Sequence, residues 1–219
     1  MIVTLNYKVL FMQETKQPLD TLQDIKKMME RSSRFISLSG WSGISAGVCA
    51  LVGAYFASKK LPARGSSGNE YDDLGLGGVQ LVNDLILIGG IVFVAAFVSA
   101  FLFTYLRSKK NNTPIWDRVA RRLMWNVLIP LAVGGVVILN VLQHAEFWLV
   151  GPFCLIFYGL ALLNASKYTL GEIRYLAFAQ LVLGLISLWM PGNDLYFWAL
   201  GFGVFHILYG FIMWWKYER

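Results

Sequence analysis

The sequence is poor in the residues from which proteins build metal sites and covalent chemistry. Its 219 residues include only two histidines and two cysteines, and charged residues make up 15% of the chain. No His-Glu-x-x-His or Walker-lysine motif is present. These absences disfavour an enzyme, and we predict no catalytic residue, no metal ion and no cofactor.

The two histidines do not form a plausible metal pair. Two are too few for a four-histidine iron centre, and a haem with two axial histidines would need both at one depth. His144 is expected at one edge of the membrane, whereas His206 is expected about 16 Å deeper in a later helix. Cys49 and Cys154 each lie inside an apolar run. We interpret them as small packing residues and not as a disulfide or a metal pair.

Apolar residues dominate what is present: 57% of the chain is hydrophobic, and its mean hydropathy is +0.55. The segment Leu195–Trp215 has no Asp, Glu, Lys or Arg, and about 20 apolar residues suffice to cross a bilayer. Five other segments resemble it. We therefore predict an all-α, polytopic transmembrane bundle with six spans, at residues 36–57, 85–106, 123–142, 147–166, 173–190 and 195–215.

The segments outside the spans differ in character. Residues 1–19 lack a sustained period, and we expect poor order there. Residues 20–35 carry apolar side chains at helical spacing among four cations, which predicts an amphipathic helix on the cytoplasmic surface. A solvated helix that leads into the first span is the alternative. Residues 58–84 have loop composition, and their Gly75–Gly78 run lacks the lysine of a phosphate-binding loop.

Lysine and arginine counts predict the orientation. If the N-terminus is cytoplasmic, the inner segments carry 16 of the 19 cations and the outer loops carry three. Cytoplasmic loops are enriched in Lys and Arg, so we predict that both ends of the chain are cytoplasmic. The basic stretch from Arg107 to Arg122 then reads as an inner loop and not as a nucleic-acid site.

Three local signals refine this picture. Pro130 predicts a kink in the third span, because proline removes one helix hydrogen bond. Thr169 and Glu172 have the spacing of a capping box at the start of the fifth span. Residues 191–194, with the sequence Pro-Gly-Asn-Asp, predict a tight turn before the last span.

Small residues recur at spacings of three and four in the first span, at Ser39, Gly43, Ala46, Gly47, Ala50 and Ala54. Ala199, Gly203 and Gly210 form a similar face around His206 in the last span. Such faces let another helix approach closely, either within the chain or in a membrane-protein partner or second copy.

One polar cluster is predicted near mid-membrane. His206, Gln180 and Tyr158 fall at depths of roughly 10–14 Å on consecutive helices, counted from the cytoplasmic ends at about 1.5 Å per residue. A polar group there cannot be left unpaired cheaply, so we expect the three side chains to satisfy one another. The alternative treats the intramembrane histidine as a ligand or proton site.

Residues 163–175 and 197–206, together with the lead 25–35, resemble a group of small six-helix bacterial membrane proteins without assigned activity. The resemblance covers most of the chain from about Asp20 onward and implies a bacterial inner membrane location. It implies no activity, ligand or catalytic residue.

Two functional hypotheses stay open. The first is a non-enzymatic subunit, sensor or assembly partner that works through helix packing. The second is a carrier of a small solute or lipid, with a neutral polar site near His206. Helices packed without a void favour the first, and a cavity open to one side near mid-membrane favours the second.

Overall fold

The computed structural model describes residues 39–61, 75–111, 116–144 and 146–219. The predicted N-terminal region (1–19), the predicted amphipathic helix (20–35) and the first residues of the first span lie outside these ranges. Much of the predicted outer loop, at 62–74, also lies outside them.

The described residues are all-helical and include no strand. In chain order the elements are α2 (Gly40–Lys60), α3 (Gly75–Lys110), α4 (Arg118–Gln143), the short 3-10 helix η1 (Phe147–Leu149), α5 (Val150–Ala165), α6 (Ile173–Leu188), α7 (Asp194–Trp198), η2 (Ala199–Phe205) and α8 (His206–Tyr217). The last three elements follow one another without a break.

Five helical segments of the described chain are long and apolar enough to cross a membrane: Gly40–Lys60, Gln80–Lys110, Arg118–Gln143, Phe147–Ala165 and Asp194–Tyr217. Ile173–Leu188 is apolar but shorter, at 16 residues. The prediction of an all-helical protein rich in candidate membrane spans is therefore confirmed.

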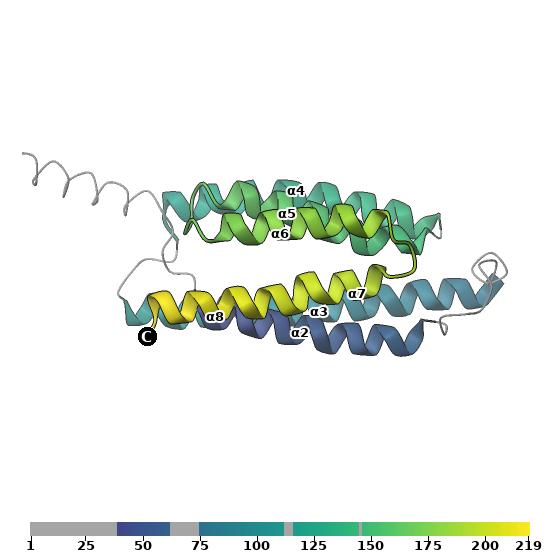
Figure 1. Ribbon diagram of the computed structural model, residues 1–219, viewed down its shortest axis with the longest axis horizontal. Coiled ribbons are helices and arrows are strands. Elements are labelled where there is room, and N and C mark those ends of the chain that lie inside the picture. The colour runs from purple at the N-terminus through teal and green to yellow at the C-terminus, as the bar shows by residue number, and fades with distance from the viewer. Residues whose placement is uncertain (1–38, 62–74, 112–115, 145) are drawn as a thin grey trace, which may run out of the picture.

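The helices lie in two layers, which Figure 1 shows one above the other. One layer holds α4, α5 and α6, with α5 packed against both of its neighbours. The other holds α2, α3 and the run α7–η2–α8, with α2 packed against both α3 and α8. The layers are joined where α7 contacts α5 and where η2 contacts α6.

Two local signals set the ends of helices. The Asp117 carboxylate accepts a hydrogen bond of 2.6 Å from the Ala120 amide and so caps α4, which begins five residues before the predicted span. The tight turn before the last span is confirmed. The Asn193 amide donates to the Met190 carbonyl, and Gly192 has a φ of +80°, a value that favours glycine.

The helix that contains the second predicted span is longer than that span. Helix α3 begins at Gly75 and ends at Lys110, whereas the sequence predicted 85–106. Residues 75–84 are therefore helix and not loop. No proline interrupts this stretch, and each glycine costs a helix only about 1 kcal/mol, so the helix can start in the glycine-rich run.

The other boundaries shift by a few residues. Helix α2 extends to Lys60, α6 ends at Leu188, and the fourth span opens with the η1 turn before α5. Pro152 lies in the first turn of α5, where its missing N–H leaves no helix bond unmade. Helix α4 is continuous through Pro130, and the predicted kink stays a prediction.

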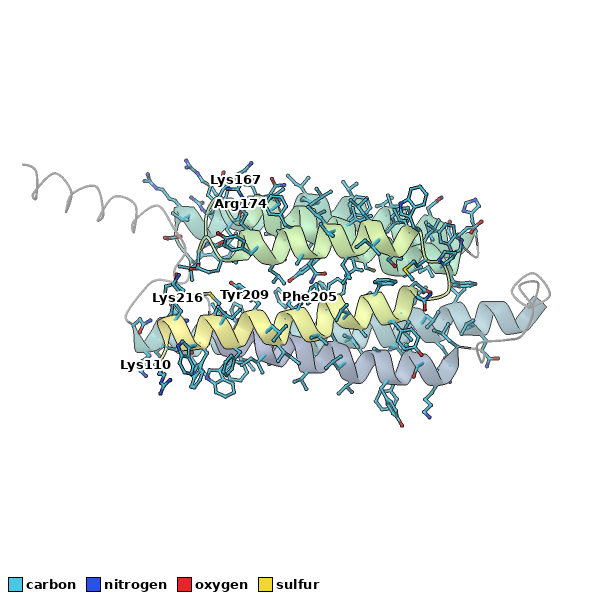
Figure 2. The ribbon with its side chains drawn as sticks, in the orientation of Figure 1. Lys110, Lys167, Arg174, Phe205, Tyr209 and Lys216 are labelled. Atoms are coloured by element: carbon cyan, nitrogen blue, oxygen red, sulfur yellow. The ribbon has the colours of Figure 1, made fainter. Side chains whose placement is uncertain are left out.

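The cations of the described chain gather at one end of the bundle. We call the end where α2, α4 and α6 begin, and where α3, α5 and α8 finish, the cationic end; it lies at the left of Figure 1. Lys110, Lys167, Arg174 and Lys216 mark it in Figure 2. Of the twelve Lys and Arg residues described, ten belong to this end, and only Lys59 and Lys60 belong to the opposite end.

Candidate functional site

A change in helical winding positions the candidate site. Seven residues of the last span, Ala199–Phe205, are wound as a π-helix between the α-helical turns of α7 and α8. Short π-helical segments inside α-helices are rare and often occur at functional sites. His206 is the first residue after this segment, and its side chain is almost fully buried, with 6% exposed.

Both ring nitrogens of His206 are hydrogen bonded. Nδ1 lies 3.0 Å from the Gly201 carbonyl oxygen, and Nε2 lies 2.7 Å from the Tyr158 hydroxyl. A carbonyl only accepts, so Nδ1 carries the proton and donates to it. In a neutral imidazole Nε2 must then accept, and the Tyr158 hydroxyl donates to it. One histidine therefore links α5 to the last span.

Gln180 reaches the same carbonyl from α6. Its Nε2 donates to the Gly201 oxygen at 2.8 Å, and its side chain is completely buried. The Gln180 Oε1 atom points at Gly201 itself, because a Cβ added to that glycine would meet it at 2.5 Å. Only glycine at position 201 leaves room for this approach.

The structure brings the three predicted residues together, but not through the contacts we expected. Tyr158 and His206 bond directly, as expected. Gln180 bonds neither of these side chains; it and His206 instead share the backbone oxygen of Gly201. The expectation that the three side chains satisfy one another is therefore wrong for Gln180. The sequence contained no signal for a backbone acceptor, since every residue carries one.

Aromatic rings surround this cluster. The Tyr158 and Phe202 ring centroids lie 5.0 Å apart, and the Phe202 ring stacks on that of His206 at 5.9 Å. A hydrogen-bonded network enclosed by apolar side chains is rigid and specifies one arrangement of its helices. Within the described chain, no carboxylate or cation bonds to any member of the cluster.

Glycines form a second contact, between α2 and α8, which we call the glycine crossing: Gly40, Gly43 and Gly47 of α2 face Gly210 of α8 and Gly203 of η2. A Cβ on Gly40 would lie 2.5 Å from the Gly210 oxygen, and one on Gly47 would lie 2.7 Å from the Gly203 oxygen. Backbones that approach this closely are typical of membrane helix pairs. The small residues predicted on both helices thus meet each other within the chain.

A third group of contacts lies at the cationic end, around Glu218. Its carboxylate accepts from the Gly40 amide at 2.5 Å and from the Ser39 hydroxyl at 3.1 Å, and it pairs with Arg107 at 2.5 Å. The carboxylate therefore joins the start of α2, the end of α3 and the end of α8. The sequence reasoning missed this role, because the partners lie more than 100 residues away.

The predicted capping box at the start of α6 is wrong. The Thr169 hydroxyl donates to the Ala165 carbonyl at 3.0 Å, and the Glu172 side chain makes no capping bond. Glu172 instead accepts from Lys216 Nζ at 2.5 Å and from the Tyr217 hydroxyl at 2.8 Å. One distant cation, Lys216, and the neutral Tyr217 hydroxyl thus take the place of the local amide as partners of this carboxylate.

Glu172 makes stability depend on pH. Partial burial acts to raise the pKa of its carboxyl, but the hydrogen bonds from Lys216 and Tyr217 outweigh burial and hold the pKa below the usual 4.5. A carboxyl whose pKa is lower in the folded chain than in the unfolded chain stabilises the fold at pH values above the unfolded pKa. This contribution is lost as the pH falls through the folded pKa. We expect the stability difference between the wild-type chain and Glu172→Gln to be present at pH 7 and to be lost progressively as the pH falls below the unfolded pKa of about 4.3. Thermal unfolding in detergent across this range measures it; a difference that does not change with pH would contradict the assignment.

Cys49 and Cys154 are both unpaired and half-buried, at positions on α2 and α5. His144 lies at the end opposite to the cationic end, where its Nδ1 is 2.8 Å from the Asn140 carbonyl oxygen. It is thus far along the bundle from His206, with no shared partner.

Comparisons of the chain with models of protein families, with curated proteins and with solved structures find no match. The resemblance to small six-helix bacterial membrane proteins stays a prediction.

Proposed function

We propose that this chain is a non-enzymatic integral membrane protein that serves as a subunit, sensor or assembly partner through helix packing. The observation that carries the proposal is that polar groups of the cluster around His206 form their hydrogen bonds with other groups of this chain. Both nitrogens of His206 and the hydroxyl of Tyr158 bond within the chain, so the candidate site acts as a clamp between helices. The exposed fractions of His206 and Gln180, 6% and 0%, leave them no free face.

The proposed topology has six spans with both ends in the cytoplasm of a bacterial inner membrane. Two observations support it: α6 lies beside α5 in the same layer, and the cations gather at one end. A 16-residue helix is about 24 Å long, which falls short of a core about 30 Å thick, so α6 requires flanking residues to reach the surface.

Cysteine labelling in intact cells tests this topology. In a background without Cys49 and Cys154, Ser67→Cys should react with a membrane-impermeant maleimide, because the loop after α2 is proposed to be external. Asn112→Cys should react only after the membrane is permeabilised. The reverse pattern would overturn the orientation.

The assembly role predicts a complex in the native membrane. Extraction with a membrane-solubilising polymer keeps neighbouring lipids and proteins together, and we expect the chain to migrate at a mass well above its own 24.7 kDa plus lipid. A matched sample dissolved in a harsh detergent should release the monomer. A monomer in both samples would contradict the assembly role.

A carrier function is the second candidate, and one observation favours it. The Oε1 atom of Gln180 and the hydroxyl of Tyr209 are buried without a hydrogen-bond partner in the described chain. Such groups are uncommon and invite a ligand or a water molecule. A carrier that uses this site would lose transport in His206→Phe while its stability stayed unchanged, whereas a clamp would lose stability.

A further inference from the structure

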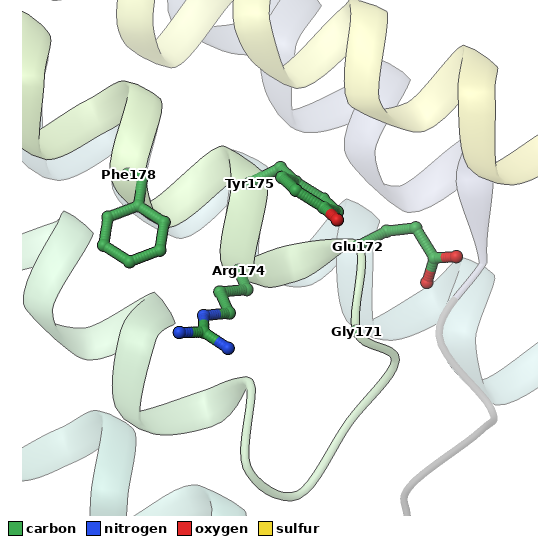
Figure 3. Close-up of a pocket in the computed structure, with 5 residues that line it drawn as sticks. All are labelled: Gly171, Glu172, Arg174, Tyr175 and Phe178. Atoms are coloured by element: carbon green, nitrogen blue, oxygen red, sulfur yellow. The ribbon is translucent and has the colours of Figure 1, made fainter.

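A pocket of about 490 Å³ lies at the start of α6, on the cationic end, away from the His206 cluster. Gly171, Glu172, Arg174, Tyr175 and Phe178 line it, and Figure 3 draws these five side chains. This volume falls within the range of sites that hold small molecules or parts of larger ones. The space beside Gly171 is open, since a Cβ added there would meet no atom within 4 Å.

The charge available in this pocket is positive. Glu172 lines it, but its carboxylate is already paired with Lys216 and bonded to Tyr217. Figure 3 shows Glu172 and Arg174 extending to opposite sides of the helix. Arg174 forms no ion pair with a described residue; its guanidinium lies 5.6 Å from the centre of the Phe178 ring. The ring holds the guanidinium while leaving its N–H donors free for an anion.

The rest of the pocket wall is apolar and faces outward. Tyr175 is 77% exposed and Phe178 is 45% exposed, although both belong to an otherwise apolar helix. Aromatic rings in the first turns of a membrane helix lie at headgroup level. A cation above exposed rings at this level matches a lipid, whose phosphate lies above its glycerol and acyl carbons.

We propose that this pocket binds the headgroup of an anionic phospholipid from the leaflet at the cationic end. Arg174 donates to the phosphate oxygens, and Tyr175 and Phe178 lie against the glycerol and the first acyl carbons. The surrounding cations, Lys167 among them, favour an anionic lipid over a zwitterionic one (Figure 2). The proposal depends on the membrane-embedded fold and not on the assembly role.

Native mass spectrometry of the full chain in detergent tests the proposal by titration with phosphatidylglycerol. We expect the wild-type chain to retain one tightly bound phosphatidylglycerol and to bind phosphatidylcholine about tenfold more weakly. Arg174→Gln should weaken the binding of phosphatidylglycerol by about the same factor. Arg121→Gln is the matched control, since it removes an exposed cation of the same end, outside the pocket, and should bind like the wild type.

A second variant fills the pocket without removing charge. Gly171→Phe places a ring in open space, so the chain should keep its helical content and lose the tight lipid. Equal binding of both lipids by the wild type, or unchanged binding by Arg174→Gln and Gly171→Phe, would overturn the proposal. Full competition by glycerol 3-phosphate at matched concentration would overturn it too, because the site would then recognise a free phosphate and not a lipid.

Discussion

Gly210→Ala should lower the free energy of unfolding by about 2 kcal/mol or more, because the new methyl group would overlap backbone atoms of α2. A Cβ at this position would lie 2.5 Å from the Gly40 oxygen and 2.6 Å from the Ile44 nitrogen. Both are backbone atoms of α2, so the helices must separate to admit it. Overpacking of this kind typically costs 1–3 kcal/mol, and here the glycine crossing would also lose its close contacts.

Gly90→Ala is the matched control for this prediction. Gly90 also lies inside an apolar helix, α3, but a Cβ there would meet no atom within 4 Å. This variant should be neutral or slightly more stable, since alanine favours a helix by about 1 kcal/mol over glycine. Unfolding in mixed micelles measures both variants. Equal stability of the two would show that the glycine crossing does not hold α2 against α8.

Glu218→Ala should have an effect of similar size, about 2 kcal/mol, because one carboxylate serves three partners. The change removes the bond to the Gly40 amide and the ion pair with Arg107, whose side chain is 12% exposed. Hydrogen bonds to charged groups contribute about 1.5–3 kcal/mol, and the loss of a mostly buried ion pair adds to this cost.

Glu146→Ala provides the control for the ion pair. Glu146 is also a carboxylate at the end of a helix, but its described contact is one exposed bond of 2.8 Å to the Trp148 ring nitrogen. Its loss should cost no more than about 0.5 kcal/mol. If Glu218→Ala were as mild as this control, the end of α8 would not tie α2 to α3.

The apolar segments could be predicted well because membrane helices are long and continuous. Most of the described residues of the six predicted segments lie in helices, and the small-residue faces of the first and last spans meet at the glycine crossing. Tyr158 and His206 also bond as their matching depths predicted. In each case the prediction used only the position of a residue along its own helix, which can be counted from the sequence.

What the sequence could not predict depends on contacts between distant residues. The π-helical winding before His206 shifts the backbone register, and Gly201 then presents its carbonyl to both Gln180 and His206. Local capping rules failed at Glu172 because Lys216 competes from 44 residues away. The start of α3 in a glycine-rich run shows the same limit, since helix propensity there is weak and tertiary context decides.

The central claim is that the His206 cluster is a clamp between helices, and a double-mutant cycle tests it most directly. His206→Phe, Tyr158→Phe and the double variant are compared by their free energies of unfolding in mixed micelles. We predict that each single variant is less stable than the wild type and that the two changes are coupled by about 0.6–1.7 kcal/mol, the range for bonds between membrane helices. Two variants as stable as the wild type, with no coupling between them, would contradict the clamp.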